Sequence, residues 1–179
     1  MDIHKLNFTV LEQDIFSLLC LKAGEKLSQR EIAKMLKVSP TAVSNSIKKL
    51  KESKLIKIEK TKTINFISFN RDEKRSIELK RVENLKNMYL SGLSDYLEST
   101  LPGGTIILFG SFSRGEDTNT SDLDIAVIER KDKILELEKY EKILNRKINV
   151  NFYDSWKKIH EHLKNNILNG ILLSGGVEL

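Results

Sequence analysis

Two aspartates, Asp122 and Asp124, stand at the start of the strand that an apolar run predicts over residues 123–128. Residues two apart on a strand point to the same face, roughly 6.5–7 Å apart along the chain. Carboxylates held side by side repel each other and lose hydration unless a positive charge lies between them. A divalent cation such as Mg²⁺, which prefers oxygen ligands, supplies that charge. The spacing therefore predicts a metal site.

Gly110 and Ser111 follow an apolar, β-branched run over residues 105–109, which predicts a buried strand. At the end of a strand this pair offers free backbone N–H groups and a hydroxyl, and Gly110 has no Cβ to obstruct a phosphate. A phosphate cradle beside paired metal-binding carboxylates is the equipment of phosphoryl or nucleotidyl transfer.

These segments together resemble a known family. Gly110–Ser111, Arg114–Gly115 and Ser121–Asp124 are similar to the signature of the nucleotidyltransferase superfamily that includes polymerase β, and most closely to its minimal nucleotidyltransferase branch. The resemblance covers roughly residues 104–179. It implies Mg²⁺ as the cofactor and a nucleoside triphosphate, expected to be ATP, as substrate or ligand.

The resemblance also implies roles for single residues. Asp122 and Asp124 would be the catalytic residues and would hold the metal against the phosphates. Arg114 would steady a phosphate or the loop, or it would pair with Glu116 or Asp117 as a structural group. The residues implied in nucleotide binding are Gly110, Ser111, Arg114 and Ser121.

Active members of the superfamily usually carry a third carboxylate on a later strand, which alternation predicts here over residues 147–153. Asn149, Asn151 and Tyr153 would share one face of that strand, and Asn151 is the position at which we expect the third metal ligand. An asparagine offers a carbonyl oxygen but neither a negative charge nor a proton acceptor. Whether the domain is an active enzyme is therefore open on the sequence.

Three functions fit these residues. The domain could transfer a nucleoside monophosphate from the triphosphate to an unknown acceptor. It could instead retain nucleotide or metal binding and act as a sensor for the other half of the chain. It could also be an interaction module, such as an antitoxin-like partner of a second protein.

The first third of the chain predicts three helices followed by a hairpin. Capping boxes at Thr9–Glu12 and Ser28–Glu31 open the first two helices, and Ser39–Pro40 opens the third. Two alternating strands follow, over residues 55–59 and 64–69.

That order, most clearly from Leu27 to Lys60, resembles the winged helix of bacterial and archaeal regulators. In such folds the third helix enters the major groove of duplex DNA, and residues 1–70 carry 13 Lys and Arg against 7 Asp and Glu. The alternatives are RNA binding or substrate presentation, and a structural role in which the lysines are only solvated. The residues expected to meet bases or phosphates are Thr41, Ser44, Asn45, Lys48, Lys49, Lys57 and Lys62.

Residues 71–101 predict one long amphipathic helix that connects the domains and packs on its own domain or forms a homodimer contact. Residues 102–179 complete the second domain, with helices expected over residues 133–144 and 155–169, the latter capped by Asp154.

The predicted fold class is therefore α+β: a winged helix over residues 1–70, a long connecting helix, and an α/β nucleotidyltransferase domain with a small mixed sheet. No apolar run approaches the ~20 residues that span a bilayer, and the N-terminus lacks the apolar core of a signal peptide. The single cysteine, Cys20, fits a reducing compartment. The sequence thus predicts a cytoplasmic transcription regulator that does not bind membranes.

Overall fold

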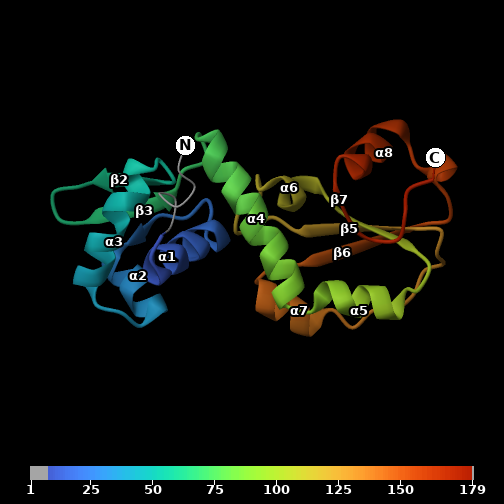
Figure 1. The fold of residues 1–179 in the computed structure, drawn as a ribbon, viewed down its shortest axis with the longest axis horizontal. Helices are drawn as coiled ribbons and strands as arrows, with labels where there is room; N and C mark the ends of the chain where they lie inside the picture. The colour runs from blue at the N-terminus through green and yellow to red at the C-terminus, as the bar shows by residue number, and fades with distance from the viewer. Residues whose placement is uncertain (1–7, 179) are drawn as a thin grey trace. The chain divides into compact units, whose positions relative to one another are not determined.

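The structure is a computed structural model that describes residues 8–178. It divides into two compact units, Met1–Lys80 and Arg81–Leu179 (Figure 1). Each unit has its own buried core. The boundary between the units falls within the predicted connecting helix. Within the described part of the chain, none of the helices is both long enough and apolar enough to cross a membrane.

Three helices open the first unit, and each begins at its predicted cap. Thr9 and Glu12 form a complete capping box, and Ser28 and Glu31 form a second. The side chain of Ser39 caps the third helix, which has proline at its first position. The helices are α1 (Val10–Leu21), α2 (Gln29–Leu36) and α3 (Pro40–Glu52).

An antiparallel sheet follows these helices, and its hairpin forms the wing. Strands β2 (Ile56–Lys60) and β3 (Asn65–Phe69) pair as predicted, and the short strand β1 (Leu27–Ser28) pairs with β3. The sequence does not predict β1, because two residues are too few to show alternation. The helix-turn-helix followed by a β-hairpin confirms the winged helix. Its core includes Ile15, Leu19, Ile32, Val43, Leu50 and Ile67.

The predicted single connecting helix is in fact two helices, α4 (Lys74–Leu90) and α5 (Leu93–Thr100). The chain turns between them at Gly92, whose φ of 75° lies in the left-handed region that favours glycine. The prediction is wrong here because apolar residues continue at helical spacing on both sides of Gly92 and hide the break. Ile77 of α4 packs on the core of the first unit, and Met88 is buried in the core of the second.

The second unit is built on a four-stranded sheet with the strand order β6-β5-β4-β7. Strand β5 runs parallel to β6, whereas β4 runs antiparallel to both β5 and β7. This arrangement confirms the small mixed sheet. The strands are β4 (Thr105–Phe109), β5 (Leu123–Ile128), β6 (Ile148–Tyr153) and β7 (Ile171–Ser174).

Helices cover both faces of this sheet (Figure 1). Leu97 of α5 and Tyr140 of α7 (Glu138–Leu144) belong to the buried cluster on one face. Ile167 of α8 (Glu161–Leu168) belongs to the cluster on the other face. The aspartates and the phosphate turn therefore lie at one end of a well-packed sheet.

The helix predicted to start at Lys133 begins only at Glu138, and residues 131–137 have no regular structure. Ile134 in this segment is 97% exposed. Leu135 and Leu137 pack on the core, but Ile134 does not, so the apolar face that a helix over this segment would bury is incomplete.

The helix predicted over residues 155–169 is also interrupted. A 3₁₀ turn, η2 (Trp156–Lys158), is separated from α8 by Ile159, which has an extended backbone. Asp154 does not cap a helix as predicted. It forms a hydrogen-bonded ion pair with Lys158, and this hydrogen bond lowers the pKa of the Asp154 carboxyl.

Candidate functional site

The predicted phosphate turn lies at the end of β4. Gly110 has a φ of 76° and begins the short helix α6 (Gly110–Arg114). A Cβ atom at this position would lie 2.7 Å from Oδ2 of Asp124, closer than non-bonded atoms approach. The left-handed backbone therefore favours glycine, and any larger residue would have to displace the Asp124 carboxylate. The turn and the second aspartate are in direct contact.

Asp122 and Asp124 both accept a hydrogen bond from the side chain of Asn149. The Nδ2 atom of Asn149 lies 3.1 Å from Oδ2 of Asp122 and 3.3 Å from Oδ1 of Asp124. Since an ionised carboxylate can only accept, the amide nitrogen is the donor in both bonds. The two carboxylates thus converge on one point.

Asn149 pairs with Asp124 across the parallel strands β5 and β6, whereas Asn151 pairs with Ala126. Contrary to the prediction, Asn149 and not Asn151 stands beside the aspartates. Alternation places both asparagines on one face, but only the register of the two strands decides which lies opposite Asp124. Asn151 is exposed and helps line a pocket of about 560 Å³ that also borders Asp124 and Asn149.

Tyr153 shares this face of β6 with the two asparagines. Its burial, and secondly the negative charge of Asp124, raise the pKa of the phenol above its ordinary value. Tyr153 therefore stays protonated at neutral pH and does not replace the missing proton acceptor.

Arg114 and Ser121, which the resemblance implies in nucleotide binding, stabilise the loop in this structure. Arg114 donates through Nε to Glu116 Oε2 at 2.8 Å and through Nη1 to Asn166 Oδ1 at 2.9 Å. The Oγ atom of Ser121 accepts from the backbone N–H of Thr118 at 2.9 Å. The sequence leaves two roles open for Arg114, contact with a phosphate or the loop and structural pairing with an acid. The structure shows the pairing, with Glu116.

A buried polar network, which the sequence does not predict, lies beside the turn. The fully buried side chain of Asp117 accepts from Nδ2 of Asn84 at 2.7 Å and from Nη2 of Arg146 at 3.3 Å. Asn84 also donates to the carbonyl of Phe112 at 2.9 Å, and Arg146 donates to the carbonyl of Asn119 at 3.3 Å. In the sequence these polar residues lie in polar stretches, so no pattern separates them from surface groups.

The residues at the aspartate pair fit a cation that prefers oxygen ligands. Asp122 and Asp124 present carboxylate oxygens toward one point, and the amide of Asn149 also carries a carbonyl oxygen. Over residues 8–178, no three His, Cys, Asp or Glu side chains form a group that could hold a metal ion. The candidate metal ligands are therefore two carboxylates and one amide.

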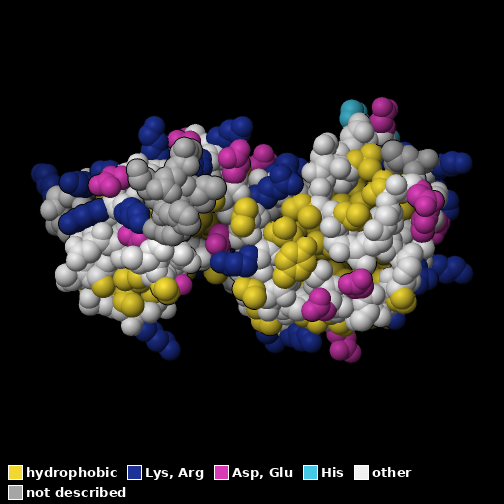
Figure 2. Space-filling view, viewed as in Figure 1, with side chains coloured by type: hydrophobic (Ala, Val, Ile, Leu, Met, Phe, Trp, Pro, Cys, Tyr) yellow, Lys and Arg dark blue, Asp and Glu magenta, His cyan; other side chains and the backbone are white. Residues whose placement is uncertain are grey.

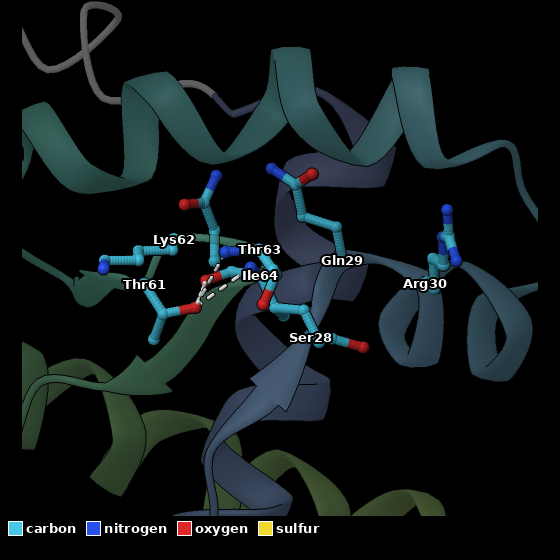
Figure 3. A pocket seen from close by; sticks show the side chains of 8 residues that line it. Ser28, Gln29, Arg30, Thr61, Lys62, Thr63 and Ile64 are labelled. Atoms are coloured by element: carbon cyan, nitrogen blue, oxygen red, sulfur yellow. Dashed lines mark hydrogen bonds between the residues drawn. The ribbon is translucent and has the colours of Figure 1, made fainter.

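A second candidate site lies on the first unit, between the start of α2 and the tip of the wing (Figure 3). It is a pocket of about 470 Å³. At the wing tip, Thr61 Oγ1 donates to the carbonyl of Ile64 at 2.7 Å and accepts from its N–H at 3.0 Å. Figure 2 shows Lys and Arg side chains gathered over the β2–β3 hairpin. The lining residues are Ser28, Gln29, Arg30, Thr61, Lys62, Thr63, Ile64 and Asn65.

Five of the residues predicted to contact DNA are accessible to a ligand. Thr41, Asn45 and Lys48 of α3 are exposed, and Ser44 is half-buried on the same helix. Lys62 is exposed at the wing tip and lines the pocket.

Lys49 and Lys57 instead interact with groups of their own unit. The Nζ atom of Lys49 lies 3.6 Å from Glu12 Oε2 and 5.2 Å from the centre of the Phe8 ring. Lys57 donates a hydrogen bond to Asp72, and this bond lowers the pKa of the Asp72 carboxyl. These contacts, which depend on the tertiary fold, differ from the phosphate contacts that the sequence predicts.

Comparison with protein families finds two matches. Residues 90–173 match the family model described as a nucleotidyltransferase domain. Residues 14–63 match the model of the MarR family. None of the curated proteins compared with the chain matches it.

Among solved structures, ZitR of Lactococcus lactis, a zinc-responsive MarR family member, is 27% identical to the chain with a TM-score of 0.38. The match covers 52% of this chain and 62% of ZitR, so the chain spans less than two thirds of that regulator. The adhesin competence repressor AdcR of Streptococcus pyogenes is 16% identical over 54% of this chain and 70% of AdcR, with a TM-score of 0.41.

The helices α2 and α3 and the first strand of the wing lie within the MarR match, and the glycine turn with its paired aspartates lies within the nucleotidyltransferase match. The chain therefore joins an N-terminal MarR-type winged-helix domain to a C-terminal nucleotidyltransferase domain.

Proposed function

We propose that the chain is a DNA-binding regulator whose C-terminal domain binds a nucleoside triphosphate, expected to be ATP, together with Mg²⁺ as a ligand. The observation that carries this proposal is the position of Asn149. Its amide donates to both Asp122 and Asp124, where an active transferase would have a third carboxylate. The site keeps the groups that bind a nucleotide and lacks the group that would accept a proton.

Each residue then has a separate task in binding. Backbone N–H groups at Gly110 and Ser111 would hold the triphosphate, and Asp122 and Asp124 would hold Mg²⁺. When bound, the cation neutralises phosphate charge. Asn149 orients the two carboxylates but has no basic atom with which to remove a proton from an acceptor hydroxyl. Binding is thereby preserved while transfer is slow.

Nucleotidyl transfer to an unknown acceptor is the second candidate function. It is favoured by the contact between Gly110 and Asp124, since both residues of the transferase signature are kept in place. In that reaction the acceptor oxygen bonds to the α-phosphorus, pyrophosphate leaves, and the hydroxyl proton goes to water. A partner-binding, antitoxin-like role, a homodimer and a cytoplasmic location stay predictions.

Thermal unfolding tests nucleotide binding. With ATP and Mg²⁺ at about 100 times the Kd, the wild-type protein is expected to gain about 2.7 kcal/mol of unfolding free energy. Asp122→Asn is expected to lose about half of this gain, because one of two metal-binding charges is removed. Asp132→Asn, at an exposed aspartate of the same domain, is the matched control and should behave as wild type. Equal stabilisation of wild type and Asp122→Asn would argue against a cation at the aspartate pair.

Binding to duplex DNA tests the N-terminal half. Lys62→Ala is expected to weaken binding similarly on all sequences and to reduce the slope of log K against log salt by about 1, since one phosphate contact is lost. Lys157→Ala, which removes the same charge at an exposed lysine of the C-terminal domain, is the matched control and should leave the slope unchanged. Fluorescence anisotropy over a series of salt concentrations measures both slopes. A slope that Lys62→Ala leaves unchanged would exclude the wing tip from the DNA contact.

A further inference from the structure

Asn84 on α4 makes two buried hydrogen bonds to the segment that follows the candidate phosphate turn. Its side chain is 5% exposed and donates to the carbonyl of Phe112 at 2.9 Å and to Asp117 Oδ1 at 2.7 Å. Phe112 lies in α6, the helix that begins at Gly110, and Asp117 lies in the loop that leads to Asp122. A displacement of the turn must therefore move Asn84 or break its buried bonds.

Arg146 extends this network to the third strand of the site. It pairs with Asp117 at 3.3 Å and donates to the carbonyl of Asn119 at 3.3 Å, and it precedes β6, the strand that carries Asn149. Asn84 is thus bonded into a single network that includes the turn, the loop before the aspartates and the start of β6.

Ser76, eight residues earlier on α4, makes a hydrogen bond within the winged-helix domain. It is fully buried, and its Oγ donates to the carbonyl of Lys54 at 3.2 Å. Lys54 follows the end of α3 and has a φ of 60°, and Asn70 Nδ2 donates to the same carbonyl at 2.7 Å. The start of α4 is therefore bonded to the turn that directly follows the proposed DNA-reading helix α3.

We propose that α4 couples nucleotide binding at the Gly110–Ser111 turn to the DNA affinity of the winged helix, through Asn84 at one end and Ser76 at the other. The helix contains neither proline nor glycine between these residues, so it has no built-in kink to absorb a displacement. This inference rests on the proposed binding of ATP with Mg²⁺. Because coupling between two binding sites is reciprocal, DNA must change the ATP affinity by the same factor.

The test uses the full-length chain, a fluorescent duplex of mixed sequence, and ATP with Mg²⁺. For the wild type, saturating ATP and Mg²⁺ are expected to change the Kd for DNA by a factor of about 5 to 150. Asn84→Ala and Ser76→Ala are each expected to bind both ligands but to lose this change. Asn87→Ala, on the same helix, is the matched control and should keep it. Calorimetry measures ATP binding separately for every variant.

The outcomes separate this inference from the proposed function. If calorimetry detects no ATP binding to the wild type, the proposed function fails. If ATP binds but the Kd for DNA does not change, the coupling is refuted and the nucleotide site stands. If Asn87→Ala also loses the effect of ATP on the Kd for DNA, the assignment of the coupling to Asn84 is refuted. Should Asn84→Ala not fold, Ser76→Ala and the reciprocal measurement, ATP affinity with and without duplex, decide the question.

Discussion

Replacing Asn149 by aspartate is expected to raise Mg²⁺-dependent nucleotidyl transfer by at least about 100-fold. The substitution supplies the carboxylate that can accept the proton of an acceptor hydroxyl, and a positioned general base contributes about 10²- to 10⁴-fold. Transfer is measured as incorporation of label from α-labelled ATP into macromolecules of an added cell lysate, which supplies candidate acceptors. The variant should also unfold more easily in EDTA than in Mg²⁺, since three adjacent carboxylates repel one another.

Asn151→Asp is the matched control for this prediction. It introduces the same charge on the same strand and face, but opposite Ala126 instead of Asp124. Its transfer rate should remain at the wild-type level. A wild type that already transfers as fast as Asn149→Asp would contradict the proposal that the nucleotide is mainly a ligand.

Replacing Gly110 by alanine is expected to have the largest effect on nucleotide binding. The left-handed backbone at φ 76° costs an L-residue about 1–2 kcal/mol, and the new Cβ would lie 2.7 Å from the Asp124 carboxylate. Relief of that contact displaces a metal ligand or the phosphate turn. Overpacking of this kind costs about 1–3 kcal/mol of folding stability. Where ATP binding must restore the original positions of the turn and Asp124, the same free energy lowers the ATP affinity by about 5- to 150-fold.

Gly92→Ala separates the cost of the left-handed backbone from the cost of the close contact with Asp124. Gly92 has nearly the same φ, 75°, but no described atom lies within 4 Å of its would-be Cβ. Urea unfolding should therefore show the backbone cost of about 1–2 kcal/mol in this variant, while calorimetry should show unchanged ATP affinity. If Gly110→Ala bound ATP as well as Gly92→Ala does, the turn would not be part of the nucleotide site.

Local signals in the sequence predicted most of the winged helix. The capping boxes at Thr9 and Ser28 and the Ser39–Pro40 start depend on residues within one helical turn, so their neighbours in sequence are sufficient to define them. The same holds for β4 and β5, whose apolar runs lie directly beside the polar turn. The two aspartates could be assigned because they are close in sequence.

Features that depend on distant residues could not be predicted in the same way. The choice of Asn149 over Asn151 follows from the register between β5 and β6, which local alternation does not determine. The buried pair of Asp117 and Arg146 joins residues far apart in the chain, and each alone has the pattern of a surface group. The engagement of Lys57 by Asp72 likewise depends on where the chain goes after the wing.

A crystal structure of the full chain with ATP and Mg²⁺ tests the central claim most directly. We predict that the triphosphate lies against the backbone of Gly110 and Ser111, and that one cation contacts both Asp122 and Asp124 with Asn149 beside them. A nucleotide bound elsewhere, or an aspartate pair that keeps both hydrogen bonds to Asn149 and no cation at saturating ATP and Mg²⁺, would contradict the account.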